Sequence, residues 1–177
     1  GDKYIEAMQD FNNKLGGVLS SLRERGEFVG EPGETLLFNP PEGSITPKKV
    51  LLIGVGEESS LTLDRLRLAG TIAARESVRL GMSHVSFAPT LRDQGSNRSD
   101  VGEGDAAVAE SFLLAYDTEL RLQEQGLASG AKIREFVIEA GPPYFEGAAE
   151  KVGAAVQSAG AALARRDAKP YRQASAK

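Results

Sequence analysis

A predicted strand over Lys48 to Ile53, with a continuous apolar run from Val50 to Ile53, constrains the fold of this chain more than any other feature. Its core reads Val-Leu-Leu-Ile, and Gly54-Val55-Gly56 follows at once. Strands that are apolar at every position are typical of the centre of a sheet, where both faces are covered. The run therefore predicts a central strand that ends in a tight turn.

A helix is predicted after this turn. Thr62 is suited to cap its first turn, Asp64 favours the N-terminal end of a helix, and Gly81 ends the apolar pattern. A second strand is expected from His84 to Ala88. Strand, helix and strand with short links form a crossover unit, so we expect two parallel strands in one sheet with the helix on its face.

The rest of the chain alternates in the same way. Apolar spacing predicts helices at Ile5 to Leu22, Asp105 to Leu122 and Phe145 to Arg166, and strands at Thr35 to Phe38 and Lys132 to Glu139. Glycines and small polar residues predict an exposed, mobile loop over 91–104. The order predicts an α/β fold in which helices flank a mixed sheet. One domain is expected over residues 1–168, with a polar tail over 169–177.

Composition argues against several kinds of partner and site. The chain has 177 residues and a formal net charge of −4, so no basic field favours nucleic acid or an anionic membrane. It has no cysteine and one histidine, which removes thiolate nucleophiles, disulfides and zinc sites built on cysteine or on two histidines. No apolar run is long enough to cross a bilayer. We expect no metal, no cofactor, no membrane and no nucleic-acid partner.

The turn Gly54-Val55-Gly56 is the best candidate for binding a phosphate group. Glycines let the backbone approach an anion, and a helix that follows offers free N–H groups. The dinucleotide pattern lacks its third glycine, because position 59 is Ser, and the neighbouring acids Glu57 and Glu58 would repel phosphate. We therefore interpret this turn mainly as a structural one.

Tyr144 and Phe145 form a second candidate site. They follow Pro142 and Pro143 and place two aromatic rings at the start of the last predicted helix. Such a pair can form the lip of a binding site for a ligand or a partner protein. It can also be a hydrophobic contact that seats the helix, which is the interpretation we prefer.

The remaining ionisable residues have simpler interpretations. Asp93, Asp100, Glu103 and Asp105 cluster in the predicted loop and carry the oxygen ligands that calcium prefers, but their spacing does not match a calcium loop. We interpret them as a solvated acidic loop. His84 has no nucleophile near it in the sequence and is expected to be a partly exposed residue at a strand end.

Several motifs resemble the N-terminal domain of the leucyl (cytosol) aminopeptidase family. They are Gly-Glu-Thr-Leu-Leu at 33–37, Lys-Lys-Val-Leu-Leu-Ile-Gly-Val-Gly at 48–56 and the helix start Leu-Thr-Leu-Asp-Arg-Leu at 61–66. Residues 14–28, 107–116 and 145–167 are similar to further helices of that domain. The resemblance covers nearly the whole chain, and it implies a three-layer fold like that of macro domains, with a mixed and mostly parallel sheet.

The same resemblance implies that this chain does not hydrolyse peptides by itself. Family members carry a two-metal site in their catalytic half, around an Asn-Thr-Asp-Ala-Glu-Gly-Arg motif that this sequence does not contain. No catalytic or metal-binding residue is therefore assigned. Family members also have one or two strands before the first helix, which implies that one strand edge here needs another cover. The first helix, the segment from Asp167 to Lys177 and a second copy of the chain are candidates, and we favour a homodimer.

Three functions are compatible with these observations. The chain is a non-catalytic binding or regulatory module that associates with itself, a peptidase or another protein; or it binds an ADP-ribose-like molecule near Gly54 as macro domains do; or it is a piece of a longer aminopeptidase. The second function lacks the Asn-rich strand end and the Gly-rich phosphate loop that it would require. Cytoplasmic location is the default expectation, although the first residue is Gly rather than Met and a removed signal peptide stays open.

Overall fold

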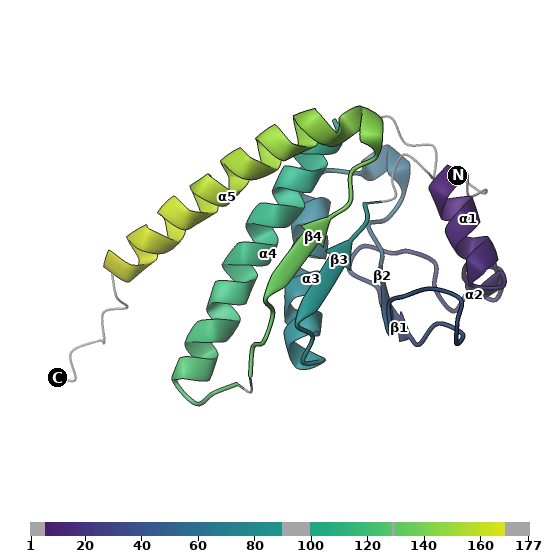
Figure 1. The fold of residues 1–177 in the computed structure, drawn as a ribbon, viewed down its shortest axis with the longest axis horizontal. Helices are drawn as coiled ribbons and strands as arrows, with labels where there is room; N and C mark the ends of the chain where they lie inside the picture. The colour runs from purple at the N-terminus through teal and green to yellow at the C-terminus, as the bar shows by residue number, and fades with distance from the viewer. Residues whose placement is uncertain (1–5, 90–99, 129, 169–177) are drawn as a thin grey trace.

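Helices and short strands alternate along the chain in a computed structural model, which describes residues 6–89, 100–128 and 130–168 (Figure 1). The helices are α1 (Glu6–Lys14), α2 (Val18–Glu24), α3 (Leu63–Arg79), α4 (Val101–Glu124) and α5 (Phe145–Ala168). The strands are β1 (Thr35–Phe38), β2 (Val50–Ile53), β3 (His84–Phe87) and β4 (Glu135–Ile138). Two 3-10 turns, η1 (Glu58–Ser60) and η3 (Pro142–Tyr144), precede α3 and α5. The predicted α/β class is confirmed.

The described strands form two separate two-stranded sheets. β1 and β2 are antiparallel, with Thr35 opposite Ile53, and β3 and β4 are parallel, with His84 opposite Glu135. β2 and β3 are not hydrogen-bonded to each other, so the prediction that the crossover unit forms one sheet is wrong for these residues. A crossover helix brings two strands to the same layer but does not make them neighbours.

One face of both sheets packs on α3 and α4. Ile53 of β2 and Val85 of β3 contact one buried cluster that contains Ala73 of α3 and Phe112 of α4. The ring of Phe136 on β4 is stacked on Phe112, with the ring centroids 3.6 Å apart. This shared cluster places the two sheets in one layer, and Figure 1 shows the strands in the order β4, β3, β2, β1 across that layer.

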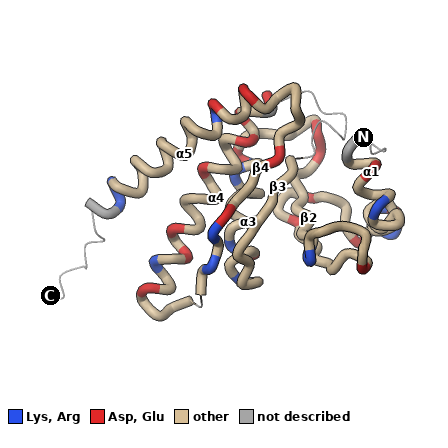
Figure 2. Tube along the Cα trace, viewed as in Figure 1, with Lys and Arg blue, Asp and Glu red and all other residues tan. Residues whose placement is uncertain are grey.

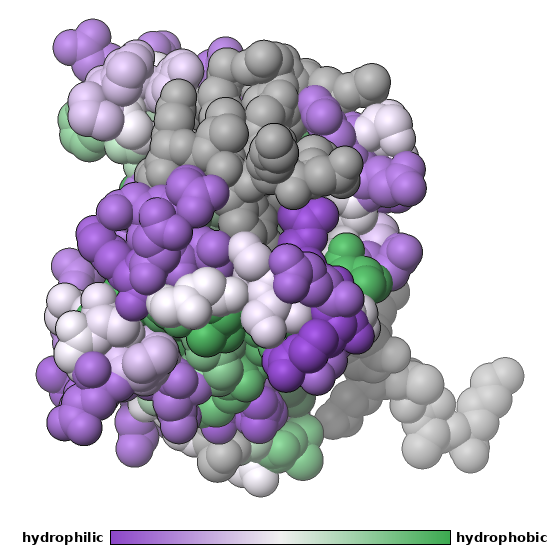
Figure 3. Space-filling view, turned by 90° about the vertical axis from the view of Figure 1, so that its right-hand side faces the viewer, coloured by the Kyte–Doolittle hydropathy of each residue, from purple (hydrophilic) through white to green (hydrophobic). Residues whose placement is uncertain are grey.

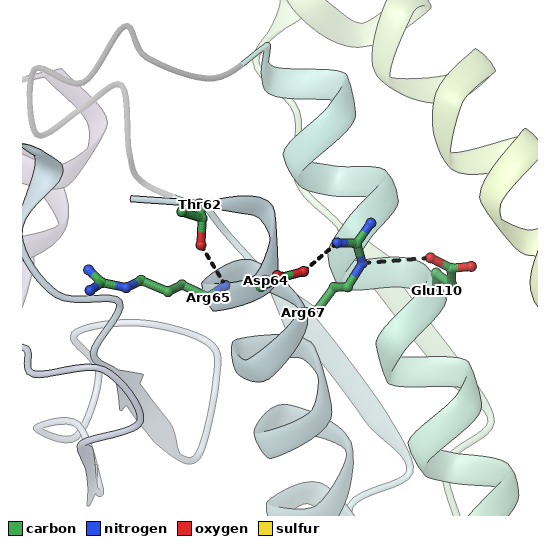
Figure 4. Close-up of polar contacts among 5 residues, drawn as sticks. All are labelled: Thr62, Asp64, Arg65, Arg67 and Glu110. Carbon is green, nitrogen blue, oxygen red and sulfur yellow. Dashed lines mark hydrogen bonds and ion pairs between the residues drawn. The ribbon is translucent and has the colours of Figure 1, made fainter. Parts of the chain in front are cut away.

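Polar contacts fix the start of α3 and join it to α4 (Figure 4). The Arg65 backbone N–H donates to the side-chain oxygen of Thr62 at 3.4 Å, so the predicted cap is confirmed. Arg67 forms ion pairs with Asp64 at 2.7 Å and with Glu110 of α4 at 3.9 Å. Because the Arg67 side chain is 45% exposed, these pairs set the orientation of the helices more than they stabilise them.

The opposite faces of the two sheets differ. Leu15 follows α1 directly, and Leu19 lies in α2. Both belong to a buried cluster that contacts Phe38 of β1 and Leu52 of β2, so α1 and α2 cover these two strands. The matching face of β3 and β4 is exposed, and Val137 there is 44% exposed. Helix, sheet and helix layers are therefore complete only over β1 and β2 in the described residues.

The predicted single helix over Ile5 to Leu22 is wrong, because the chain breaks between α1 and α2. Gly16 and Gly17 have φ values of +66° and +80°, a conformation that glycine adopts without strain. The side-chain oxygen of Asn12 accepts the Leu19 backbone N–H at 3.1 Å and fixes the break. Two short helices result, α1 and α2, in place of one long helix.

α4 starts earlier than the sequence predicts. Residues 101–104 are helical, so the predicted exposed loop over 91–104 is wrong there, and its residues 91–99 lie outside the described residues. The last helix was predicted correctly as α5, and the tail over 169–177 also lies outside the described residues.

The described surface carries mixed charge. Acidic and basic residues are both spread along the helices (Figure 2). On the side seen in Figure 3, hydrophilic side chains border a recessed apolar area. Within the part of the chain that the structure describes, no helix is long and apolar enough to span a membrane.

Candidate functional site

The Gly54-Val55-Gly56 turn is tied to the preceding turn by backbone hydrogen bonds. The Gly54 N–H donates to the Glu34 carbonyl, and the Gly56 N–H donates to the Gly30 carbonyl, both at 2.8 Å. A Cβ on Gly54 would lie 2.1 Å from the Glu31 carbonyl oxygen, which leaves no room for any other residue. Gly56 has φ of +80°, a conformation that other residues rarely adopt, so we expect the fold to need glycine at this position.

The backbone N–H groups of the neighbouring turn bind a carboxylate of the chain itself. The Glu34 carboxylate accepts the backbone N–H groups of Val29, Gly30 and Glu31, the shortest at 2.7 Å. Arg65 donates to the Val55 carbonyl at 3.3 Å and to Ser60 Oγ at 2.7 Å. The N–H groups of Gly54 and Gly56 are thus engaged within the chain, and this arrangement favours a structural turn over a phosphate site.

The predicted acidic cluster is divided between two environments. Asp100 caps α4 by accepting the Glu103 N–H at 3.2 Å, and Lys151 of α5 pairs with Asp100 at 2.8 Å and with Glu103 at 3.9 Å. The hydrogen bond from Lys151, helped by the Glu103 N–H, lowers the pKa of Asp100. Asp105 is buried, so it does not belong to a solvated loop. Asp93 lies outside the described residues, among which no group of three or more His, Cys, Asp or Glu could hold a metal ion.

The two titratable candidates near the strands are exposed. His84 lies at the start of β3, and its Nδ1 is 2.8 Å from Ser83 Oγ. Glu57 and Glu58 are also exposed, at the start of η1. These positions agree with the simple interpretation of each residue as a surface group.

Of the two predicted aromatic residues, Phe145 lines a cavity and Tyr144 does not. Tyr144 ends η3, and Phe145 starts α5 with 63% of its surface exposed. Phe145 lines a cavity of about 350 Å³ between α4, α5 and the end of β4, whose wall also includes Leu113, Phe136 and Val156. The lip that the sequence suggested at Phe145 therefore has a cavity beside it.

Asp105 is the one functional candidate that sequence reasoning assigned to the wrong environment. It lines the same cavity, is 1% exposed, and its two side-chain oxygens have no hydrogen-bond partner among the described residues. Burial, together with the nearby Asp100 charge, raises the pKa of Asp105 to about 6. The sequence signal was available: Asp105 stands four residues before Ala109 and eight before Leu113, on the apolar side of α4.

Comparison with known proteins identifies the family. Residues 1–125 match the N-terminal domain of the cytosol aminopeptidase family. The chain belongs to the cytosol aminopeptidase family. A probable cytosol aminopeptidase of Geotalea uraniireducens is 38% identical over 106 residues, 59% of this chain and 20% of that protein. Another, of Gloeothece citriformis, is 30% identical over 138 residues, 74% of this chain and 26% of that protein.

Solved structures agree with this assignment. A tomato leucine aminopeptidase mutant superposes with a TM-score of 0.63 at 19% identity, over 90% of this chain and 30% of that one. The bottromycin maturation enzyme BotP superposes with a TM-score of 0.55 at 25% identity, over 78% of this chain and 28% of BotP. This cytosol aminopeptidase-family chain therefore spans about a fifth to a third of these proteins, and the family model that it matches is that of the N-terminal domain.

Proposed function

We propose that this domain is a non-catalytic association module whose open strand edges bind an extended segment of a second protein chain. The observation that carries the proposal is the unpaired space between β2 and β3. Both strands belong to the same layer over α3, yet among the described strands β2 pairs only with β1 and β3 only with β4.

The hydrogen bonds at the strand ends tell which groups face this space. The Gly54 N–H donates to the Glu34 carbonyl on the β1 side, so by alternation the N–H and C=O groups of Leu51 and Ile53 point away from β1. The Phe87 carbonyl accepts the Glu139 N–H on the β4 side, so the corresponding groups of Ser86 point away from β4. The outward-facing donors and acceptors of β2 and β3 therefore have no strand partner among the described residues.

Unpaired edges of this kind favour strand addition. A strand with free N–H and C=O groups is a template for an extended segment of another chain, which gains main-chain hydrogen bonds on binding. Here an added segment would form main-chain hydrogen bonds with both β2 and β3. α1 and α2 cover a face of the β1–β2 sheet and add no strand to it. We favour a second copy of the chain as the partner over a separate peptidase.

Molecular mass in solution tests the proposal. Light scattering coupled to size-exclusion chromatography should give a concentration-dependent mass that approaches twice the monomer mass of 18.8 kDa. Ser86→Pro should return the monomer, because proline removes an N–H that points away from β4 and has no strand partner among the described residues.

Ser86→Ala is the matched control. The Ser86 hydroxyl donates to the Glu139 carboxylate at 2.5 Å, and both substitutions remove this bond while only proline removes the N–H. The alanine variant should therefore dimerise like the parent. A monomeric parent, or a proline variant that dimerises equally well, would contradict self-association. If the parent is monomeric but binds a purified family peptidase, and Ser86→Pro abolishes that binding, the peptidase is the partner.

A further inference from the structure

A buried carboxylate without a partner marks a second site, away from the β2 and β3 edges. Asp105 is 1% exposed, and neither of its side-chain oxygens has a hydrogen-bond partner among the described residues. Buried charges are normally paired, because an unpaired one loses its hydration without compensation. Asp105 is therefore either neutral or paired with a group that the chain itself does not provide there.

The surroundings of Asp105 are apolar. Asp105 is the one charged residue in the described wall of the cavity between α4, α5 and β4, which has a volume of about 350 Å³. The other wall residues are alanine, leucine, isoleucine, valine and phenylalanine side chains, among them Leu113, Ile138 and Val152. A cavity of this size and composition is at the lower end of the range for small-molecule sites.

Lys151, on the helix beside this cavity, is already paired with other carboxylates. It lies 2.8 Å from Asp100 and 3.9 Å from Glu103. Asp100 and Glu103 add negative charge on the same side, so the described groups around Asp105 favour a cation rather than supply one.

We propose that this cavity binds a small molecule that carries an ammonium group on a compact apolar body. The ammonium group would pair with Asp105, and the apolar body would lie against Leu113 and Phe136, with Phe145 at the mouth. Phe136 is held in place by its stacking on Phe112, so this wall is formed before a ligand enters. At neutral pH the Asp105 carboxylate is mostly ionised, since its pKa is about 6, and a bound cation offsets the cost of burying it.

Three probes with one apolar body and different head groups test this site. The probes are 3-methylbutan-1-amine, 3-methylbutan-1-ol and 3-methylbutanoate, titrated into the full chain at neutral pH and followed by backbone amide NMR shifts. The amine should bind at least about tenfold more tightly than the alcohol, because a charge-assisted hydrogen bond is worth about 1.5 to 3 kcal/mol. The carboxylate should not bind, and the shifts should fall in α4, β4 and α5.

Variants separate the charge from the shape of the site. Asp105→Asn keeps the side-chain size and should bind the amine and the alcohol equally. Ala149→Leu adds a side chain to the cavity wall and should weaken all binding, while Ala154→Leu, an exposed position on the same helix that does not line the cavity, should leave binding unchanged. A parent chain that binds no amine or binds the amine no better than the alcohol, or an Asn variant that keeps the preference, would overturn the proposal.

Discussion

At the level of single residues, the carboxylate of Asp105 links stability to pH. Its folded-state pKa of about 6 lies above the unfolded value of about 3.9, so the folded chain holds this proton more tightly than the unfolded chain does. Asp105 therefore does not change the free energy of unfolding below about pH 4, lowers it as the pH rises toward 6, and lowers it by the full amount above pH 6. Asp100 has the opposite effect on the free energy of unfolding. Its pKa is lowered in the folded chain, so its ionised carboxylate stabilises the fold above about pH 4.

Asp105→Asn should therefore raise the free energy of unfolding at neutral pH by about 2 to 3 kcal/mol relative to the parent, with the difference vanishing near pH 4. Denaturant unfolding of both chains at several pH values measures this difference, and contributions of Asp100 and other carboxyl groups cancel in it. An equal pH dependence in the two chains would show that the Asp105 carboxyl has an ordinary pKa.

Gly56 has a conformational role that a substitution should expose. Its φ is +80°, and a Cβ there would lie 2.5 Å from Arg65 Nη1 and 2.9 Å from Pro32 Cγ. Gly56→Val should lower the free energy of unfolding by about 1 to 3 kcal/mol through backbone strain and crowding. Gly43 has φ of +75° with open space around it, so Gly43→Val should cost less. An unchanged melting temperature for the Gly56 variant would reverse this assignment.

At the level of elements, Gly70 of α3 is a point of close approach between α3 and α4. A Cβ on Gly70 would lie 2.3 Å from Ser111 Oγ and 2.6 Å from the Val108 carbonyl oxygen, so the two helices touch through backbone there. Gly70→Ala should destabilise the chain by about 1 to 2 kcal/mol, since overpacking exceeds the gain in helix propensity. The melting temperatures of the parent and the Gly70→Ala variant measure this effect.

Gly153 in α5 provides the control for this prediction. It has nothing within 4 Å of its built Cβ, so Gly153→Ala should stabilise the chain by about 0.5 to 1 kcal/mol. If both glycine substitutions stabilise the protein, α3 and α4 do not approach at Gly70 as described.

The sequence predicts most elements of the described chain and little of how the strands pair. Periodicity and the Thr62 cap are local signals, and they place α3, α5 and the four strands correctly within a few residues. The break at Gly16 and Gly17 was missed because the apolar spacing continues across it. Strand pairing depends on contacts between distant segments, which is why the separate β1–β2 and β3–β4 pairs did not follow from the crossover pattern.

The candidate site was only partly predictable, because some of its residues stand out locally and others depend on contacts between distant segments. The aromatic residue Phe145 stands out in the sequence, and its cavity lies beside it. Asp105 was assigned to a loop because glycines at 102 and 104 suggested one. In the structure, Gly102 and Gly104 lie within α4, where a Cβ on Gly102 would meet α5 and one on Gly104 would meet α3 at 3.1 Å.

At the level of the whole molecule, the family assignment and the absent peptidase motif lead to a negative prediction. The purified chain should not release p-nitroaniline from leucyl-p-nitroanilide with manganese, magnesium or zinc present, because its sequence lacks the ligand motif of the two-metal site. A purified full-length family aminopeptidase is the positive control. Metal-dependent turnover that persists through repurification would refute the prediction.

The central claim is that the gap between β2 and β3 receives an added strand, and amide hydrogen exchange at Ile53 and Ser86 tests it most directly. The Ile53 and Ser86 N–H groups point away from β1 and β4, whereas the Gly54 and Glu139 N–H groups are hydrogen-bonded to strand neighbours within the chain. We expect exchange at Ile53 and Ser86 to slow as protein concentration rises, while exchange at Gly54 and Glu139 stays slow throughout. Fast exchange at Ile53 and Ser86 at every concentration would contradict it.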